Sequence, residues 1–202
     1  MSGDEAQRLE SLWGGDFGDE YVKRNFDDGS ARVPLWQWVL DTIEAKTVLE
    51  VGCNVGGNLR ALATLLGVEN VAGVDINASA LAALKEAEPR IRTELTPAKE
   101  LPFADGEFDL VFTTGVLIHQ PQETLPDVMD EIVRVSGRYV VCGEYFAEAT
   151  EEVHYRGHEG ALFRADFGAL YAERGLKELD RKFFPQDAVW DDLTVWILEK
   201  SA

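Results

Sequence analysis

The chain has 202 residues, of which 46% are hydrophobic and 28% charged, and its 37 acidic and 19 basic residues give a net charge of −18. This length and apolar content support one α/β domain with a full hydrophobic core and exclude an intrinsically disordered chain. The negative charge argues against nucleic acid and anionic membranes as partners, because their phosphates are bound through Lys and Arg.

The N-terminal ten residues are polar and acidic, unlike an export signal, and no apolar run reaches the ~18 residues of a membrane-spanning helix. The only two cysteines, Cys53 and Cys142, are too few for a disulfide framework and are typical of small buried hydrophobes. We therefore expect a cytoplasmic protein without a membrane anchor.

Three helices are predicted in residues 1–45, at 4–14, 18–26 and 30–45. The third is expected to begin at Ser30 as its N-cap. Its apolar stripe comprises Leu35, Trp36, Val39, Leu40 and Ile43. We expect this segment to form a helical cap that belongs to the same domain as residues 46–202.

From residue 46 onward, short runs rich in β-branched residues alternate with amphipathic segments, which is typical of parallel strands joined by crossover helices. The predicted strands are 47–51, 70–76, 91–95, 108–114 and 138–146, and the predicted helices between them are 58–67, 78–88 and 126–136. A helix at 163–175 and two strands at 177–186 and 193–200 follow. The last connection is too short for a crossover helix, so these two strands are expected to pair antiparallel.

A glycine-rich turn follows the first strand and contains Gly52, Gly56 and Gly57. Such a turn lets backbone N–H groups and a helix N-terminus approach a nucleotide or a carboxylate. Asn54 stands where a further glycine is most common, and Asn is the non-glycine residue that best tolerates the left-handed region. An ordinary strand-to-helix turn remains the alternative.

Asp75 lies 23 residues after Gly52, at the end of the second predicted strand. An acidic residue at this place can accept two hydrogen bonds from a ribose diol, and Ile76 would then lie beside the adenine. Asp75 could instead cap the helix that is expected to begin near Ala78. Together, loop and carboxylate predict an adenosine site.

These motifs carry a resemblance to a known family. Residues 49–59 (LEVGCNVGGNL), 73–77 (GVDIN), 101–112 (LPFADGEFDLVF) and the terminal strand pair resemble the class I S-adenosylmethionine-dependent methyltransferases. Within them, WGGDFGDEYVKRN, GVLIHQ, EYF, YRGH, LFRADF and FPQDAVWDDLTVWILEK resemble the pseudaminic acid biosynthesis-associated methylases. The resemblance implies a Rossmann-like, seven-stranded, mostly parallel sheet with helices on both faces and an antiparallel C-terminal hairpin. The methyl donor would lie across the carboxyl ends of the strands.

The resemblance also implies a set of donor-binding residues around these ends. They are Glu50, Gly52, Cys53, Asn54, Asn58, Asp75, Ile76, Asn77, Ala98, Thr114 and Gly115. The chain departs from the family at residues 96–98 (TPA), where an Asp-Ala pair commonly supplies a carboxylate to the adenine amino group. Adenine recognition would then fall to a backbone carbonyl, another side chain, Glu94 or Glu100.

The donor also carries a carboxylate, which needs a compensating cation. Tyr21, Arg24 and Asn25 on a preceding helix are expected to bind it, because Arg forms paired hydrogen bonds with carboxylates. A surface role for Arg24, with its stem over an aromatic ring, is the alternative.

His119 follows the fourth predicted strand, where ligands bind in open α/β sheets. With an ordinary pKa near ~6.5 it could take a proton from an acceptor hydroxyl or amine, or it could only pack beneath the donor. Tyr145, after the fifth strand, is a second candidate base or orienting group.

The long connection after the fifth strand concentrates aromatic and basic side chains, which is typical of acceptor recognition. The candidates are Tyr155, Arg156, His158 and Arg164. The two arginines suggest a carboxylate or phosphate on the acceptor, although surface salt bridges explain them equally well. His154 and His158 have a metal-ligand spacing, but Gly157 between them argues against a helix, and no metal is predicted.

The predicted function is transfer of a methyl group from S-adenosylmethionine to an oxygen or nitrogen of a small polar acceptor, such as a sugar, a sugar nucleotide or an amino-acid-like metabolite. One alternative breaks another C–S bond of the donor, by aminopropyl transfer or cyclisation. Others are a non-catalytic protein that binds the donor and a nicotinamide-dependent reductase. The Trp-rich N-terminal segment leaves a homodimer open.

Overall fold

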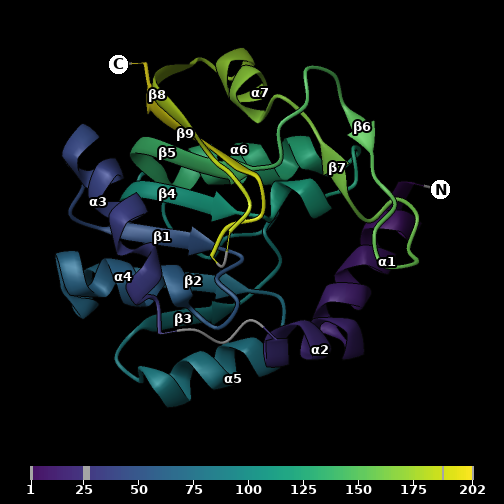
Figure 1. The fold of residues 1–202 in the computed structure, drawn as a ribbon, viewed down its shortest axis with the longest axis horizontal. Helices are drawn as coiled ribbons and strands as arrows, with labels where there is room; N and C mark the ends of the chain where they lie inside the picture. Colours follow the sequence, from purple (N-terminus) through teal and green to yellow (C-terminus); the bar gives the residue numbers. More distant parts are fainter. Residues whose placement is uncertain (1, 25–27, 188, 202) are drawn as a thin grey trace.

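A computed structural model describes residues 2–24, 28–187 and 189–201. Its centre is a seven-stranded sheet with the strand order β3-β2-β1-β4-β5-β9-β8 (Figure 1). The strands of this sheet are β1 Val48–Val51, β2 Val71–Asp75, β3 Arg92–Leu95, β4 Phe108–Thr114, β5 Ser136–Glu144, β8 Leu176–Phe184 and β9 Leu193–Lys200. A separate two-stranded ribbon consists of β6 Glu151–Glu152 and β7 Phe163–Arg164.

Helices cover both faces of the sheet. The α-helices of the described residues are α1 Ser2–Gly14, α2 Asp16–Arg24, α3 Val33–Thr42, α4 Gly57–Leu66, α5 Ala78–Ala87, α6 Leu125–Val135 and α7 Phe167–Glu173. Single 3-10 turns occur at η1 Ser30–Arg32, η2 Val68–Asn70 and η3 Leu117–His119. In the described part of the chain, no helix combines the length and the apolar character needed to cross a membrane.

The first five strands are parallel, whereas β9 runs antiparallel to β5 and β8 antiparallel to β9. The predicted α/β fold and its reversed C-terminal hairpin are therefore confirmed. The chain leaves β1 toward β2 on one side and later adds β4 on the other side. This change of direction opens a crevice at the carboxyl ends of β1 and β4, which is where open α/β sheets bind ligands.

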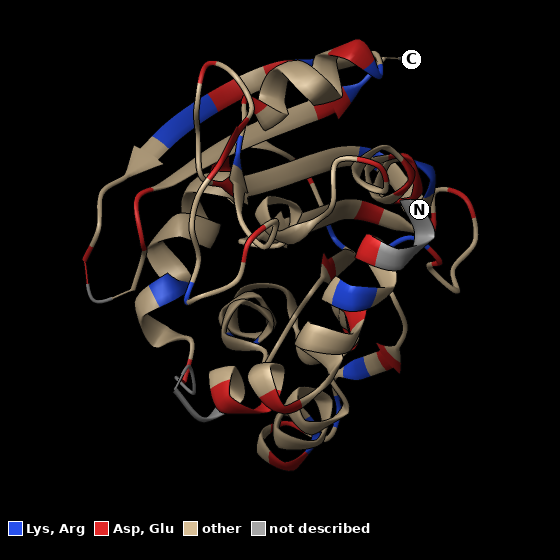
Figure 2. Ribbon diagram, turned by 90° about the vertical axis from the view of Figure 1, so that its right-hand side faces the viewer, with Lys and Arg blue, Asp and Glu red and all other residues tan. Residues whose placement is uncertain are grey.

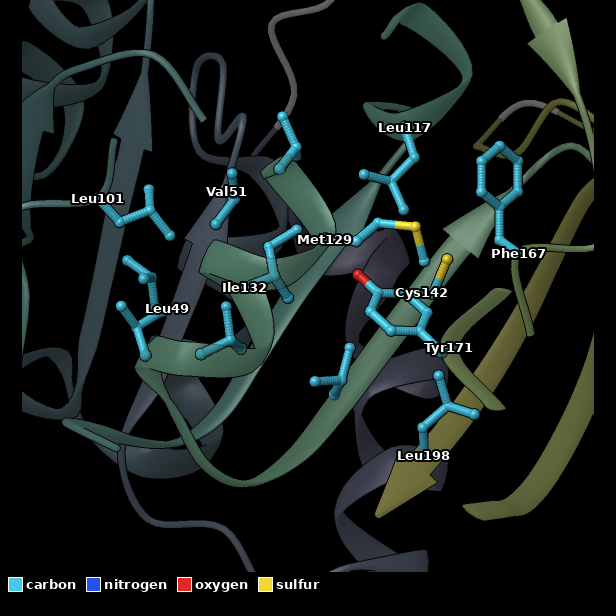
Figure 3. Packing of buried hydrophobic residues seen from close by; sticks show 14 of the residues in the cluster. Leu49, Val51, Leu101, Leu117, Met129, Ile132, Cys142, Phe167, Tyr171 and Leu198 are labelled. Carbon is cyan, nitrogen blue, oxygen red and sulfur yellow. The ribbon is translucent and has the colours of Figure 1, made fainter. Parts of the chain in front are cut away.

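The alternation of side chains along the strands divides the core into two layers. Val48 and Leu110 face α3, α4 and α5, whereas Leu49 and Val111 face α6 and α7. On the second face, Met129 and Ile132 of α6 pack over the sheet (Figure 3). Both layers hold the sheet rigid beneath the loops at its carboxyl edge.

The N-terminal helices occupy two different places. α1 and α2 lie beside the carboxyl ends of the parallel strands, whereas α3 lies on a sheet face and packs against α4 (Figure 1). The assignment of residues 1–45 as one cap stays a prediction.

Two local predictions are wrong. Ser30 does not cap α3; its hydroxyl donates to Asp28, and α3 begins at Val33 with Pro34 in its first turn. Proline lacks the N–H that a cap would bind and favours the first turn of a helix. Residues 163–164 form a strand because they pair with β6, and α7 starts only after Asp166, whose side chain accepts from the N–H of Ala169 at 2.9 Å.

Candidate functional site

A cavity lies between the carboxyl edge of the sheet and helices α1 and α2. Loops that follow β1, β2, β3 and β4 form its inner wall. The predicted site residues that line it are Tyr21, Gly52, Asn54, Asp75, Ile76, Asn77, Ala98, Thr114, Gly115 and His119. The structure therefore brings most of the predicted donor-binding residues together around one hollow.

The turn after β1 has the conformation expected from its sequence. Gly52 and Gly56 have φ values of +76° and +75°, and Asn54 adopts the left-handed region at +46°. A Cβ atom on Gly52 would come within 2.4 Å of a Val116 methyl, so only glycine allows the turn to pack this closely against the segment after β4. The backbone of the turn thereby reaches the cavity wall.

Asp75 holds this turn from the neighbouring strand. Its carboxylate accepts the N–H of Asn54 at 2.7 Å and the N–H of Asn77 at 2.8 Å. Burial raises the pKa of the Asp75 carboxyl above its ordinary value of 3.8. A carboxylate has about four acceptor positions, so Asp75 can accept further hydrogen bonds from a ligand in the cavity.

Asp75 does not cap α5, so that alternative is wrong. The cap is Asn77, whose side-chain oxygen accepts the N–H of Ala80 at 2.8 Å. Its amide nitrogen donates to the Trp13 carbonyl at 3.0 Å and to Asp19 at 3.1 Å. Asn77 therefore joins α5 to both N-terminal helices.

A buried polar network supports the turn from behind. Asn58 donates to Glu50 at 2.7 Å and to the Thr114 hydroxyl at 3.3 Å. The Asn58 carbonyl oxygen accepts from Trp36 at 3.1 Å and from Arg32 at 3.3 Å. Glu50, Asn58 and the equally buried Cys53 are absent from the described cavity wall. These three residues support the wall.

Helix α1 forms the outer wall, which the sequence analysis did not foresee. Its contribution consists of Ala6, Leu9, Glu10 and Trp13. The spacing of Ala6, Leu9 and Trp13 follows one helix face, so helical periodicity carried a signal for this wall. Glu10 pairs with Lys99 at 2.6 Å beside Ala98, where the methyltransferases that the sequence resembles commonly have a carboxylate. The indole N–H of Trp13 is buried and has no acceptor within the described residues.

Of the three residues predicted to bind the donor carboxylate, the structure describes the side chain of Tyr21. Tyr21 lines the cavity with its ring centroid 5.5 Å from that of Trp13, and burial raises the pKa of its hydroxyl. Arg24 is the last residue of α2, but its side chain and all of Asn25 lie outside the described residues. Arg32, which sequence reasoning missed, donates to Asn58 behind the wall at 3.3 Å and is not itself part of the described cavity wall.

His119 lines the cavity at the end of η3. Its Nδ1 lies 2.6 Å from the Ala161 carbonyl oxygen, which can only accept, so Nδ1 carries a proton. Burial lowers the pKa of His119 from 6.5 to about 4. The neutral ring therefore keeps a lone pair on Nε2 and packs at 4.5 Å from Trp13 and at 5.2 Å from Tyr155, measured between ring centroids.

The residues after β5 have other partners than expected. The Tyr145 hydroxyl donates to Asp191 at 3.0 Å, and desolvation and this carboxylate raise its pKa. Tyr145 is not part of the described cavity wall. Glu144, which sequence reasoning did not single out, is fully buried and accepts from the backbone of the turn that carries His119.

Part of the predicted acceptor loop lies against helices α1 and α2. Tyr155 lies beside His119, and the His158 ring centroid is 5.2 Å from that of Phe17. Arg156 is exposed, with its guanidinium 5.7 Å from the Tyr155 ring. Arg164 lies on β7, 3.7 Å from Glu151, so it has a surface partner. Within the described residues, no three potential ligands cluster as a metal site.

Acidic segments are spread over the edge that carries α1 and α2 and over the adjoining loops (Figure 2). This agrees with the net charge of −18.

Comparison with known proteins gives one family match. Residues 48–137 match the family profile described as "Methyltransferase domain". The 2-methyl-6-phytyl-1,4-hydroquinone methyltransferase of Synechocystis is 32% identical over 139 residues, which cover 63% of this chain and 43% of that protein. The chain spans less than half the length of the curated relatives that it matches.

Solved structures match almost the whole chain. Magnesium protoporphyrin IX methyltransferase from Synechocystis, solved with bound SAM, has a TM-score of 0.72 at 14% identity and covers 98% of this chain and 97% of its own. The 1,6-didemethyltoxoflavin-N1-methyltransferase of Burkholderia thailandensis has a TM-score of 0.72 at 16% identity, with coverages of 98% and 87%. The chain has the class I methyltransferase fold. At this identity the likeness establishes the fold, and the chemistry must be argued from the residues.

Proposed function

We propose that the chain is an S-adenosylmethionine-dependent methyltransferase that modifies an oxygen or nitrogen of a small polar acceptor. The observation that carries the proposal is the Asp75 carboxylate, which lines the cavity and orders the turn at Asn54 while keeping acceptor capacity. A ribose diol is the ligand chemistry that such a carboxylate takes at the end of β2.

The other walls fit the rest of the donor. Ile76 and Ala98 offer apolar surface to an adenine ring, and Glu10 on α1 offers a carboxylate where residues 96–98 have none. For the amino-acid part, Tyr21 in the cavity wall offers a hydroxyl, and Arg32, bonded to Asn58 behind the wall, offers a cation. S-adenosylmethionine, when bound, would supply a methyl group whose bond to the positively charged sulfur breaks readily, with S-adenosylhomocysteine as the leaving group.

The chain's own residues would then orient the acceptor and exclude water. The Nε2 lone pair of His119 accepts a hydrogen bond from the acceptor's O–H or N–H, whereas its pKa of about 4 makes it a weak base. Positioning therefore contributes more than proton removal. Trp13 of α1, which lines the cavity, and Tyr155 of the loop after β5 both pack on His119.

The loop that contains Tyr155, beside His119, supports an anionic acceptor. Arg156 is exposed and has no carboxylate within ion-pair distance among the described residues, so it remains available to an anionic group. A carboxylate- or phosphate-bearing acceptor agrees with the resemblance to methylases of sugar pathways, which stays a prediction.

Calorimetry with S-adenosylhomocysteine tests the proposal. Asp75→Ala removes two or more charge-assisted hydrogen bonds to the ligand and is expected to weaken its binding about 100-fold, which corresponds to about 3 kcal/mol. Asp109→Ala is the matched control, because Asp109 also accepts two backbone N–H groups, at 2.8 and 3.0 Å, but at the amino end of β4. It should leave the affinity within about twofold, a difference of roughly 0.4 kcal/mol.

Absence of binding by the unaltered protein at millimolar ligand would overturn the proposed function. Mass spectrometry of the turnover product separates the variants of the reaction: S-adenosylhomocysteine supports methyl transfer, whereas methylthioadenosine contradicts it.

A further inference from the structure

Glu144 is the last residue of β5 and has no solvent exposure. Its Oε1 accepts the N–H groups of Val116 at 3.2 Å and Leu117 at 3.1 Å, and its Oε2 accepts that of Ile118 at 3.3 Å. A single carboxylate thus binds three consecutive backbone amides of the turn that follows β4.

These amides need an external acceptor. The first N–H groups of any helical turn have no partner within it, and buried ones must find one elsewhere. The side chains of Leu117 and Ile118 are buried in the core, where Leu117 lies above Met129 (Figure 3). Water therefore has little access to the N–H groups of this turn. Glu144 supplies the missing acceptor.

The turn connects two parts of the cavity wall. Val116 packs against Gly52, where a Cβ would approach it to 2.4 Å. The Val116 carbonyl accepts the N–H of His119 at 3.0 Å, and the His119 ring is fixed by Ala161. A displacement of the turn therefore moves the glycine-rich loop and the imidazole together.

A carboxylate is a costly choice for a purely structural acceptor at this depth. Burying a charge without a cation loses more hydration than an uncharged side chain would, and burial raises the pKa of Glu144 to about 7. A charged acceptor, however, binds several N–H groups more strongly and in a narrower geometry than a neutral one does.

We infer that Glu144 is a positioning residue, whose carboxylate fixes residues 116–118 and through them sets the place of His119 and of the Gly52 turn. Its consequence for ligand binding rests on the proposed function, whereas its effect on His119 does not. Glu144 is not part of the described cavity wall, so it acts through the turn.

The test compares Glu144→Gln with the unaltered chain. Glutamine keeps one acceptor oxygen but turns an N–H donor toward the amides, so the turn must shift. The ring Nδ1–H of His119, bonded to Ala161, should give a slowly exchanging proton resonance that is readily assigned among three histidines. In Glu144→Gln this resonance should move or exchange at least tenfold faster, and S-adenosylhomocysteine should bind about tenfold more weakly.

Asp109→Asn is the matched control, because it also weakens a carboxylate that binds backbone amides of the same sheet. It should lower the unfolding temperature without changing the His119 resonance or the affinity. Glu144→Asp keeps the charge but shortens the reach by one methylene. Its His119 resonance should lie between those of the unaltered protein and of Glu144→Gln. If Glu144→Gln does not fold, the His119 resonance of Glu144→Asp tests the positioning role.

An unchanged His119 resonance in the folded variants overturns the inference, as does an equal change in Asp109→Asn. A changed resonance in a protein that binds no S-adenosylhomocysteine in any form supports the positioning of His119 and contradicts only the proposed function.

Discussion

Replacing His119 by Asn should alter how stability depends on pH. The substitution removes the titrating ring but keeps a side-chain N–H that can donate to the Ala161 carbonyl, 2.6 Å from Nδ1 in the structure. Burial lowers the pKa of His119 from its ordinary 6.5 to about 4, so the folded protein binds this proton less readily than the unfolded chain does.

The sign and size follow from that difference. A group with a lowered folded pKa contributes stability fully above the unfolded pKa and loses it as the pH falls toward the folded one. Relative to its value at pH 7.5, the free energy of unfolding of the unaltered protein should therefore fall, because of His119, by about 1.3 kcal/mol at pH 5.5 and by about 2.5 kcal/mol at pH 4.5. Glu144, with a pKa of about 7, has the opposite effect, since its contribution is present below 4.5 and lost as the pH rises through about 7.

Because the two groups oppose each other, the difference between proteins is the informative quantity. Urea unfolding of the unaltered protein and of His119→Asn at pH 7.5, 5.5 and 4.5 measures it, with Glu144 and all other carboxyls common to both. Between pH 7.5 and pH 4.5, we expect the free energy of unfolding of the variant to rise by about 2.5 kcal/mol relative to that of the unaltered protein. Parallel stability curves would refute the assignment of His119 as a half-buried, neutral imidazole.

The remaining predictions concern the glycine-rich turn after β1 and helices α1 and α2. Gly56→Ala should lower the free energy of unfolding by about 2 to 4 kcal/mol, since its φ is +75° and its Cβ would meet Leu84 at 2.4 Å. Gly175→Ala, at +83° with open space around it, should cost only about 1 kcal/mol in the same urea titration, and equal losses would contradict the packing argument. Asn77→Asp keeps the α5 cap but loses the donor to the Trp13 carbonyl, so limited proteolysis within residues 2–24 should become several times faster. An unchanged cleavage rate would mean that this bond does not hold α1 and α2 in place.

Local signals predicted the sheet and the turn well. The strands 108–114 and 193–200 were placed at the residues that form β4 and β9, because runs of large apolar residues leave little choice of conformation. The left-handed conformation of Asn54 was also foreseen, since a turn this tight needs it and few other residues accept it.

What failed depends on partners distant in the sequence. Residues 163–164 continue a helical pattern, yet they pair with β6 once that strand is nearby. In the sequence, Glu144 is a polar residue at the end of a strand. Its bond to the backbone after β4 forms only because β4 and β5 are neighbours in the sheet. The contribution of Glu10 to the cavity likewise depends on where α1 docks.

The reversal of the last strand has a practical consequence for handling the protein. β9 ends at Lys200, whose ammonium donates to the carbonyls of Val133 in the last turn of α6 and of Ser136 at the start of β5. Its final residues therefore leave the sheet on the side remote from the cavity. A fluorophore or an immobilising linker attached there would leave ligand entry unobstructed, which a parallel final strand would not have allowed.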